Sequence, residues 1–158
     1  MNKPKDSRKK RKANHKPNRC AIYARCATDP TSASNSIAKQ IRFCIEYAEQ
    51  KQWDVVKEFV RVDLAVSGGS LARRKELRSL MGAAEKRPRT FDRVLIADMS
   101  RLARTLDHFL QIMNHFKING VDVTTIKEGF IWPEHRTHLI LGDGRTVFIG
   151  VEKKGSRQ

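Results

Sequence analysis

The sequence predicts a three-layer α/β fold with a mostly parallel central sheet. Short apolar runs alternate along the chain with segments whose apolar residues recur at helical spacing. The run at 93–98 (RVLIAD) is continuously apolar, as in a strand that is covered on both faces. A chain of 158 residues has room for a single core and a tail. Strands that alternate with helices in this way favour parallel pairing through crossover helices.

The expected elements follow one another as strand, helix, strand, helix, strand, helix and strand, at 20–25, 34–51, 54–62, 73–86, 93–98, 102–119 and 121–126. The first helix has apolar residues at every third or fourth position and an N-cap at Ser34 or Ser36. The second helix is short and basic, and Pro88 prevents its continuation. The third helix ends at Gly120, because glycine suits a helix C-terminus.

The strands are predicted from short apolar runs that have turn-forming residues at their ends. The glycine-rich segment 66–70 (VSGGS) predicts a flexible loop before the second helix. Beyond Gly129 the pattern changes, and 138–141 with 146–151 predict a β-hairpin around an Asp-Gly turn at 143–144. The expected organisation is therefore an arm at 1–19, a folded domain at 20–129, and a hairpin with a polar tail at 130–158.

Charge points to a polyanionic partner. The chain carries 32 Lys and Arg against 17 Asp and Glu, a net charge of +15. Residues 1–19 hold nine of the basic residues and one acid, and we expect this arm to be disordered because it repels itself and buries little. Basic residues gather again at 73–89. Nucleic acid is the first candidate partner, and a solubility tail or an RNA-coating extension is the alternative.

Several other classes are not expected. No apolar run approaches the roughly 20 residues of a membrane span, and the N-terminus lacks the apolar stretch of a signal peptide, so we expect a cytoplasmic protein without a membrane partner. Cys20, Cys26 and Cys44 show no C-x-x-C spacing, which indicates reduced thiols. The histidines lack the spacing of a metal site and no P-loop is present, so neither metal nor cofactor is expected.

Four arginines lie in or beside the segments that connect predicted strands to the helices that follow them: Arg25, Arg74, Arg101 and Arg104. Ligands of open α/β sheets gather beyond the carboxyl ends of the strands. A spacing of three places Arg101 and Arg104 on one helical face, and planar guanidinium groups bind phosphate oxygens in pairs. The four together predict a phosphate site, whereas any one alone is more often a solvated surface residue.

Short motifs run in order from residue 21 to 129: Ile22-Tyr23-Ala24-Arg25, Ser36-Ile37-Ala38-Lys39-Gln40, Ser67-Gly68, Arg74 with Leu77, Ser100-Arg101-Leu102-Ala103-Arg104, and Lys127-Glu128-Gly129. In this order and spacing the chain resembles the N-terminal catalytic domain of the serine recombinases, the resolvase and invertase group, particularly its large-recombinase branch. The resemblance covers about two thirds of the chain and implies a resolvase-like fold, DNA as partner and recombination as function.

In that family a serine two residues after the first-strand arginine attacks a DNA phosphodiester and forms a phosphoserine link. Here that position is Ala27. The resemblance assigns activation of the serine and stabilisation of the phosphorane to four arginines, with Gln40 in support: Arg25, Arg74, Arg101 and Arg104. Many members have an acid just before the third arginine, where this chain has Ser100. Asp98 lies two residues earlier, and we expect its side chain to point elsewhere.

A methyl group cannot attack phosphorus, so the chain as written is expected not to cleave DNA. Cys26 and Thr28 should project away from position 27. Serines 32, 34 and 36 fall in an expected loop, which would not hold a nucleophile in place. Ala27 fits two explanations, a natural pseudoenzyme and an alanine introduced to trap an inactive form.

The resemblance also implies partners. Family members act as oligomers, so this chain would assemble with itself or with active recombinase subunits. The long dimerisation helix and the DNA-reading domain of the family have no counterpart in 130–158, where Pro133 and the Asp-Gly turn argue against a long helix. A recombinase-like protein is the leading hypothesis. A catalytically silent regulator that binds DNA or a partner is the alternative, and an RNA-associated basic protein ranks last.

Overall fold

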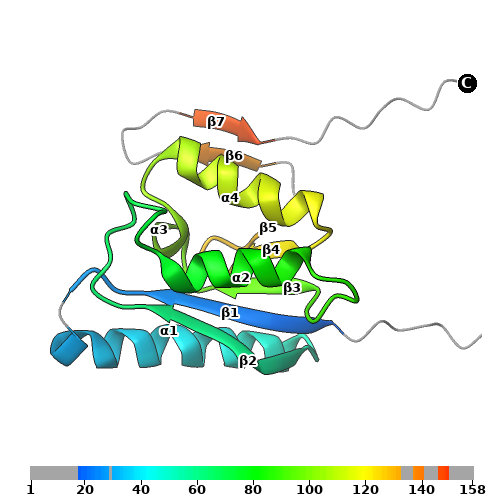
Figure 1. Ribbon diagram of the computed structural model, residues 1–158, viewed down its shortest axis with the longest axis horizontal. Coiled ribbons are helices and arrows are strands. Elements are labelled where there is room, and N and C mark those ends of the chain that lie inside the picture. The colour runs from blue at the N-terminus through cyan, green and yellow to red at the C-terminus, as the bar shows by residue number, and fades with distance from the viewer. Residues whose placement is uncertain (1–17, 29, 133–136, 141–145, 150–158) are drawn as a thin grey trace, which may run out of the picture.

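The computed structural model describes residues 18–28, 30–132, 137–140 and 146–149. Their elements, shown in Figure 1, are β1 (Arg19–Arg25), α1 (Pro30–Gln50), β2 (Asp54–Asp63), α2 (Lys75–Glu85), β3 (Arg93–Ile96), α3 (Met99–Leu102), α4 (Leu106–Ile118), β4 (Asp122–Thr125), β5 (Phe130–Trp132), β6 (Thr137–Ile140) and β7 (Thr146–Ile149). The expected arm lies almost wholly outside the described residues, and so does the turn of the expected hairpin.

The central sheet has the strand order β2-β1-β3-β4-β5. Neighbours among β1 to β4 run parallel, and β5 pairs antiparallel with β4 at the edge. The predicted parallel sheet is confirmed. Strand β5 was not expected, because three residues are too few to show an alternating pattern. The C-terminal strands β6 and β7 pair antiparallel, with Thr137 opposite Ile149, in agreement with the predicted hairpin.

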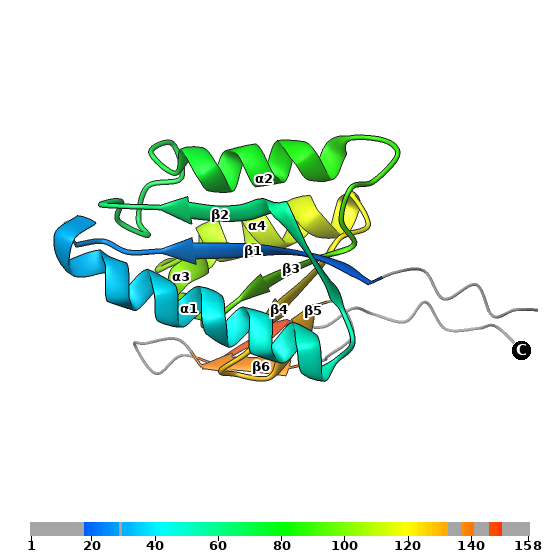
Figure 2. The same cartoon turned by 90° about the horizontal axis from the view of Figure 1, so that it is seen from below.

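Three layers form because the sheet is apolar on both faces. Figure 2 shows the strands between α1 on one side and α2 with α4 on the other. Successive residues of β1 point to opposite faces, as the pleat requires. Cys20 and Ile22 pack toward Cys44 of α1, whereas Ala21 and Tyr23 pack into the larger cluster that holds α2 and α4.

Helix α1 begins earlier than expected. It starts at Pro30, so the predicted cap at Ser34 or Ser36 is wrong and both serines lie inside the helix. Proline at the first helical position is favourable, because its fixed φ suits the helix and its missing N–H would have no partner there. The apolar spacing alone did not reveal this additional N-terminal turn, because the residues 30–36 are mostly small and polar.

The single helix expected at 102–119 is wrong. The chain forms the four-residue helix α3, then an extended link at 103–105, and then α4. Thr105 begins the new helix, because its side chain accepts a hydrogen bond from the backbone N–H of His108. The helical spacing of apolar residues continues across the break, so the pattern conceals it. Gly120 follows α4 with φ of +69°, as expected of a residue that ends a helix.

The three cysteines are free and buried. Burial raises the pKa of the Cys20 and Cys44 thiols to about 12, so both stay protonated at neutral pH. Among the described residues, no helix combines the length and apolarity needed to cross a membrane.

A buried carboxylate at the end of β2 positions helix α2. Asp63 is 4 % exposed and accepts hydrogen bonds from the backbone N–H groups of Glu76 and Leu77, at 3.0 and 3.1 Å. Tyr23 donates its hydroxyl proton to the same carboxylate at 2.9 Å. Residue 74 provides no side-chain cap for α2, so Asp63 satisfies N–H groups that the helix itself leaves without partners.

Replacing this carboxylate should therefore destabilise the fold. In the Asp63→Asn variant an amide NH2 faces N–H donors, and we expect the free energy of unfolding to fall by about 1–3 kcal/mol. Urea denaturation followed by circular dichroism measures the change. The exposed Asp54, at the start of β2, supplies the control Asp54→Asn. Equal effects of the two substitutions would contradict the capping role.

Candidate functional site

The candidate site lies at the carboxyl edge of the parallel sheet. Strand β1 ends at Arg25 and β3 at Ile96, and the two strands are paired neighbours that point the same way. The chain leaves β1 toward β2 on one side, while β3 lies on the other side, so the strand order reverses here. Open α/β sheets bind ligands at such a switch point. Ala27 lies two residues beyond β1 and is exposed.

Arg25 is buried, with 2 % of its surface exposed. Its guanidinium donates to three backbone carbonyls, those of Val66 at 2.8 Å, Ser100 at 2.7 Å and Arg101 at 3.0 Å. It therefore connects the loop after β2 to helix α3.

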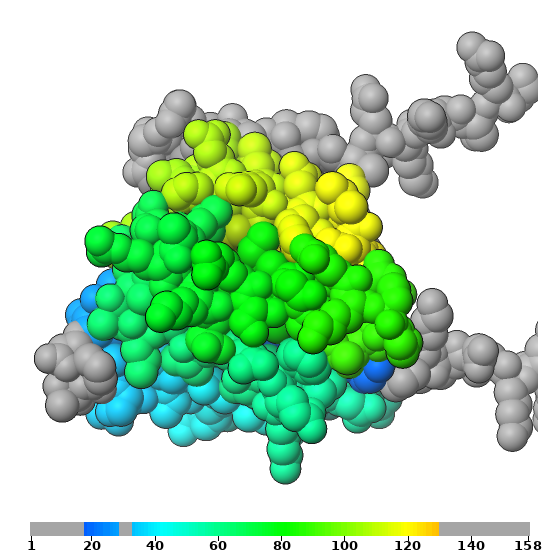
Figure 3. Space-filling view, viewed as in Figure 1, coloured from blue at the N-terminus to red at the C-terminus, as the bar shows by residue number. Residues whose placement is uncertain are grey.

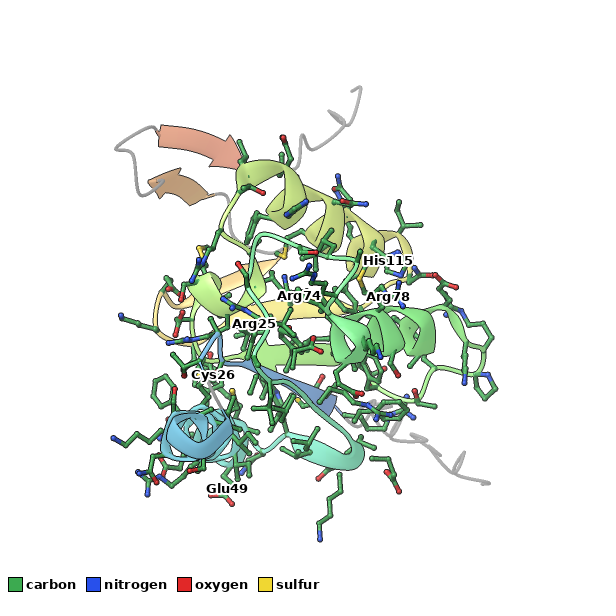
Figure 4. All side chains as sticks on the ribbon, turned by 60° about the vertical axis from the view of Figure 1, so that its left-hand side comes forward. Arg25, Cys26, Glu49, Arg74, Arg78 and His115 are labelled. Carbon is green, nitrogen blue, oxygen red and sulfur yellow. The ribbon has the colours of Figure 1, made fainter. Side chains whose placement is uncertain are left out.

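Arg74 is fully buried at the N-terminus of α2. Its Nε donates to the Tyr23 hydroxyl at 3.0 Å, and its two terminal nitrogens donate to the carbonyls of Leu102 and Arg101. The guanidinium also lies over the Tyr23 ring, 5.2 Å from its centroid. Figure 4 shows the labelled side chains of Arg25 and Arg74 in the same interior region.

The two buried arginines hold the end of α3. The last carbonyls of any helix lack an intrahelical donor, and in a four-residue helix almost every carbonyl is in this position. The carbonyls of Ser100, Arg101 and Leu102 accept hydrogen bonds from Arg25 or Arg74 instead. Cations are also favourable at a helix C-terminus. Two arginines expected to bind phosphate therefore shape the segment that carries the other two.

Arg101 and Arg104 are the accessible members of the set. Arg101 is partly exposed and Arg104 is exposed. Arg104 lies in the extended link after α3, so the expectation that both occupy one helical face is wrong. Arg104 instead contacts the glycine loop, where its Cγ lies 3.1 Å from the position that a Cβ on Gly68 would take.

Asp98 interacts with the site, contrary to expectation. Its carboxylate pairs with the Nε of Arg101 at 3.2 Å and accepts a hydrogen bond from the Ser100 hydroxyl. The expectation failed because the chain turns into α3 directly after Asp98, which brings residues three apart onto one side. Burial acts to raise the pKa of Asp98, but the Ser100 hydroxyl and the Arg101 charge outweigh it and hold the pKa below its ordinary value.

The arginines share one electrostatic neighbourhood. Burial lowers the pKa of the Arg25 guanidinium, and the positive charges of Arg74, Arg104 and Arg101 lower it further. Asp98 is the one carboxylate that forms an ion pair with any of the four within the described part of the chain. The site thus holds more positive than negative charge, which favours an anionic ligand.

Gln40 fixes the backbone that leads to position 27. Its side-chain oxygen accepts from the Arg25 backbone N–H at 3.2 Å, and its nitrogen donates to the Arg25 carbonyl at 3.1 Å and to the Ser36 hydroxyl at 3.3 Å. The amide thereby acts as a clamp on both backbone groups of one residue. Gln40 contacts none of the guanidinium groups through a hydrogen bond in the described residues.

The neighbours of Ala27 are engaged with each other. The Sγ of Cys26 and the Oγ1 of Thr28 lie 2.9 Å apart, and this hydrogen bond lowers the pKa of the Cys26 thiol. The serines at 32, 34 and 36 belong to α1, so the loop expected there is wrong. The hydroxyl of Ser36 accepts from Gln40.

Sequence reasoning missed the supports of the site. Asp63 and the contact between Gly68 and Arg25 were not expected. An acid directly after an apolar strand was the available signal for Asp63. For Gly68 the glycine pair was visible, but its packing against an arginine depends on tertiary structure. Among the described residues, no group of three or more His, Cys, Asp or Glu side chains could hold a metal ion.

Comparisons with known proteins agree with this fold. The family model for the resolvase N-terminal domain matches residues 20–143. The structure is similar to the N-terminal catalytic domain of TP901-1 integrase, with 28% sequence identity, a TM-score of 0.60, and coverage of 72% of this chain and 80% of that one. No match was found among curated proteins.

Two further structures share the fold. A resolvase family site-specific recombinase from Streptococcus pneumoniae has a TM-score of 0.65 at 19% identity, covering 75% of this chain and 78% of that one. The C-terminal catalytic domain of IS1535 TnpA, an IS607-like serine recombinase, has a TM-score of 0.52 at 16% identity, covering 67% and 69%.

The chain belongs to the resolvase family, because the family model spans most of it. At the level of the family, this places it among proteins of site-specific recombination, whose domains act on DNA as oligomers.

Gly68 tests how tightly the loop packs on Arg25. A Cβ at this position would lie 2.9 Å from Arg25 Nη2, a group that its carbonyl partners hold in place. We expect Gly68→Ala to lower the free energy of unfolding by about 1–3 kcal/mol through overpacking. At Gly69 the nearest atom is 3.7 Å away, so Gly69→Ala is the matched control and should change stability by about 0.5 kcal/mol or less. If both variants unfold at the same urea concentration, the loop does not pack as described.

The lowered pKa of Asp98 predicts that the stability of the fold depends on pH. A carboxyl group whose pKa is lower when folded stabilises the fold above its unfolded pKa of about 3.9, and that stability is lost as the pH falls through its folded pKa. Asp98→Asn should therefore cost stability at pH 7, and the difference from the parent should shrink below about pH 4. Urea unfolding at both pH values measures it, with Glu49→Gln on the exposed side of α1 as control. A difference that stays constant with pH would refute the ion pair.

Proposed function

We propose that this chain binds a DNA phosphodiester at the carboxyl edge of β1 and β3 but does not cleave it as written. One observation carries the proposal: Arg25 and Arg74 both donate to carbonyls of α3, which holds Arg101, while Arg104 and Arg25 both pack at Gly68 and the exposed Ala27 lies two residues beyond Arg25. The resemblance to serine recombinases gives all four a role in handling the scissile phosphate.

Charge supports an anion at this place. Desolvated guanidinium groups repel one another, and an anion that binds among them relieves the repulsion. Arg101 and Arg104 present exposed guanidinium surface for first contact. Arg25 and Arg74 lie behind them and supply positive potential while their donors hold the α3 carbonyls. A guanidinium has five N–H donors, so each retains capacity beyond its present bonds.

Position 27 lacks the atom that the reaction needs. In the family, the serine oxygen bonds to phosphorus while the bond to the 3′ oxygen breaks. Ala27 offers no oxygen, and the hydroxyl of Thr28 is hydrogen-bonded to Cys26. We therefore infer a pseudoenzyme that keeps the phosphate site without the nucleophile.

A second candidate function follows from the same residue. Ala27 also favours a catalytically silent regulator, which binds DNA or joins active recombinase subunits in the cytoplasm. The two candidate functions predict different results when a serine is restored at position 27. A recombinase that lacks only its nucleophile regains DNA cleavage, whereas a regulator whose site no longer supports catalysis does not.

Restoring the serine is the decisive experiment. We expect Ala27→Ser, incubated with supercoiled DNA from the neighbourhood of its gene, to form a covalent protein–DNA adduct, because the arginines needed for phosphoryl transfer remain. The adduct is measured by denaturing gel electrophoresis and by mass spectrometry of the phosphoserine peptide. The parent chain and Ala38→Ser, which adds a hydroxyl at an exposed position of α1, should give none.

A second substitution separates the site from the nucleophile. Ala27→Ser combined with Arg101→Ala should lose the adduct while it keeps its fold. The absence of any adduct from Ala27→Ser, with DNA binding intact, would contradict the hypothesis of a recombinase that lacks only its nucleophile and favour the silent regulator.

A further inference from the structure

The outer face of helix α2 carries exposed positive charge in addition to the buried arginines. Lys75 and Arg78 are exposed on the side of the helix that faces away from the core, and the exposed Lys86 follows directly at its C-terminus. Arg73 precedes the helix and Arg87 follows it, and both are exposed. Figure 3 shows α2 at the centre of one face of the molecule, between α4 and the α1 side. We call these five residues the α2 basic face.

These cations lack acidic partners. In the described part of the chain, no ion pair involves any residue of the α2 basic face. The two acids of the helix are engaged elsewhere, Glu76 with Arg61 at 3.4 Å and Glu85 with His115 at 3.3 Å. Arg87 donates to backbone carbonyls, which leaves its charge without a neutralising group. On α1, by contrast, Arg42 pairs with Glu46.

The middle of the same face carries small residues. Gly82 lies inside α2, and a Cβ built on it would meet nothing within 4 Å. Core packing therefore does not require glycine, although glycine disfavours a helix relative to alanine. Ser79, one turn earlier, is also small and exposed. The helix backbone is thus open to close approach between two basic ends.

The spacing fits a polynucleotide backbone. Lys75 and Lys86 are 11 positions apart, which corresponds to about 16 Å along a helix axis. A duplex rises about 3.4 Å per base pair, so this distance corresponds to about five base pairs along the duplex axis. Arg73 and Lys75 flank the buried Arg74, so the face adjoins the loop that covers Arg25.

We propose that the α2 basic face is a second DNA contact, which binds the phosphate backbone of duplex DNA flanking the phosphodiester at the candidate site. The inference rests on the proposed function, because it takes duplex DNA as the ligand. It adds a surface that holds DNA by charge and close approach without reading its sequence.

Salt titration of DNA binding tests the inference. The full chain and its variants are titrated onto a 30-base-pair fluorescent duplex from low to moderate salt, and the slope of log affinity against log salt is compared. Each phosphate contact contributes about 0.9 to the slope, so a triple variant Lys75→Gln, Arg78→Gln, Lys86→Gln should lower it by about 2–3. The control removes the same charge from exposed lysines on α1, its following turn and β2, as Lys39→Gln, Lys51→Gln, Lys57→Gln. Equal slopes for the two triple variants would overturn the inference.

A variant without charge change tests close approach. Gly82→Leu should fold, because open space surrounds the position, yet its side chain should hold a duplex away from the helix and weaken binding at least several-fold. Gly82→Ala should bind nearly as the parent does and unfold at higher urea concentration. Parental affinity in Gly82→Leu would overturn the helix contact.

Three further outcomes are distinguishable. If the parent does not bind the duplex, the proposed function fails together with this inference. If Arg104→Gln weakens binding while the α2 triple variant behaves as its control, the inference alone fails. If polyglutamate of equal charge displaces the duplex as well as unlabelled duplex does, the face suits an acidic protein and the assignment to DNA is overturned.

Discussion

Two buried guanidinium groups hold the carbonyl end of a four-residue helix, and the site depends on this contact. Arg25 and Arg74 reach α3 from the ends of different elements and donate to the carbonyls of residues 100, 101 and 102. Hydrogen bonds from charged groups contribute about 1.5–3 kcal/mol each, and a buried cation without such partners would be far more costly. Without them, neither α3 nor the direction of the chain toward Arg104 would be defined.

The same contact links site and core. Arg74 donates to Tyr23, Tyr23 donates to Asp63, and Asp63 accepts from the first N–H groups of α2. This chain of hydrogen bonds crosses from α3 through β1 to α2, so the helix that continues from Arg74 is oriented by residues of the proposed phosphate site. The fold needs these arginines whichever residue stands at position 27, because they support structure as well as charge.

Positive charge thus lies in two places, at the buried arginines of the candidate site and on the exposed α2 basic face. Inside, guanidinium groups are desolvated and bound to carbonyls, and their mutual repulsion favours an anion nearby. Outside, Lys75, Arg78 and Lys86 are solvated and unpaired in the described structure, so they attract phosphate at longer range. The loop at 64–74 joins the two regions, and Gly68 allows its close packing against Arg25.

The sequence by itself determined the layers of the fold, because strand and helix periods are local properties that apolar residues reveal. It also placed four arginines and Ala27 in segments that follow strands, because parallel strands end at one edge. It did not reveal the break at 103–105, since the apolar spacing runs on through it, nor the clamp of Gln40 or the pairing of Asp98 with Arg101. Those depend on which carbonyls and charges lie close in space, and residues as far apart as Arg25 and Arg101 meet only when the sheet has formed. Tertiary structure therefore decided which arginines are buried and which remain open to a ligand.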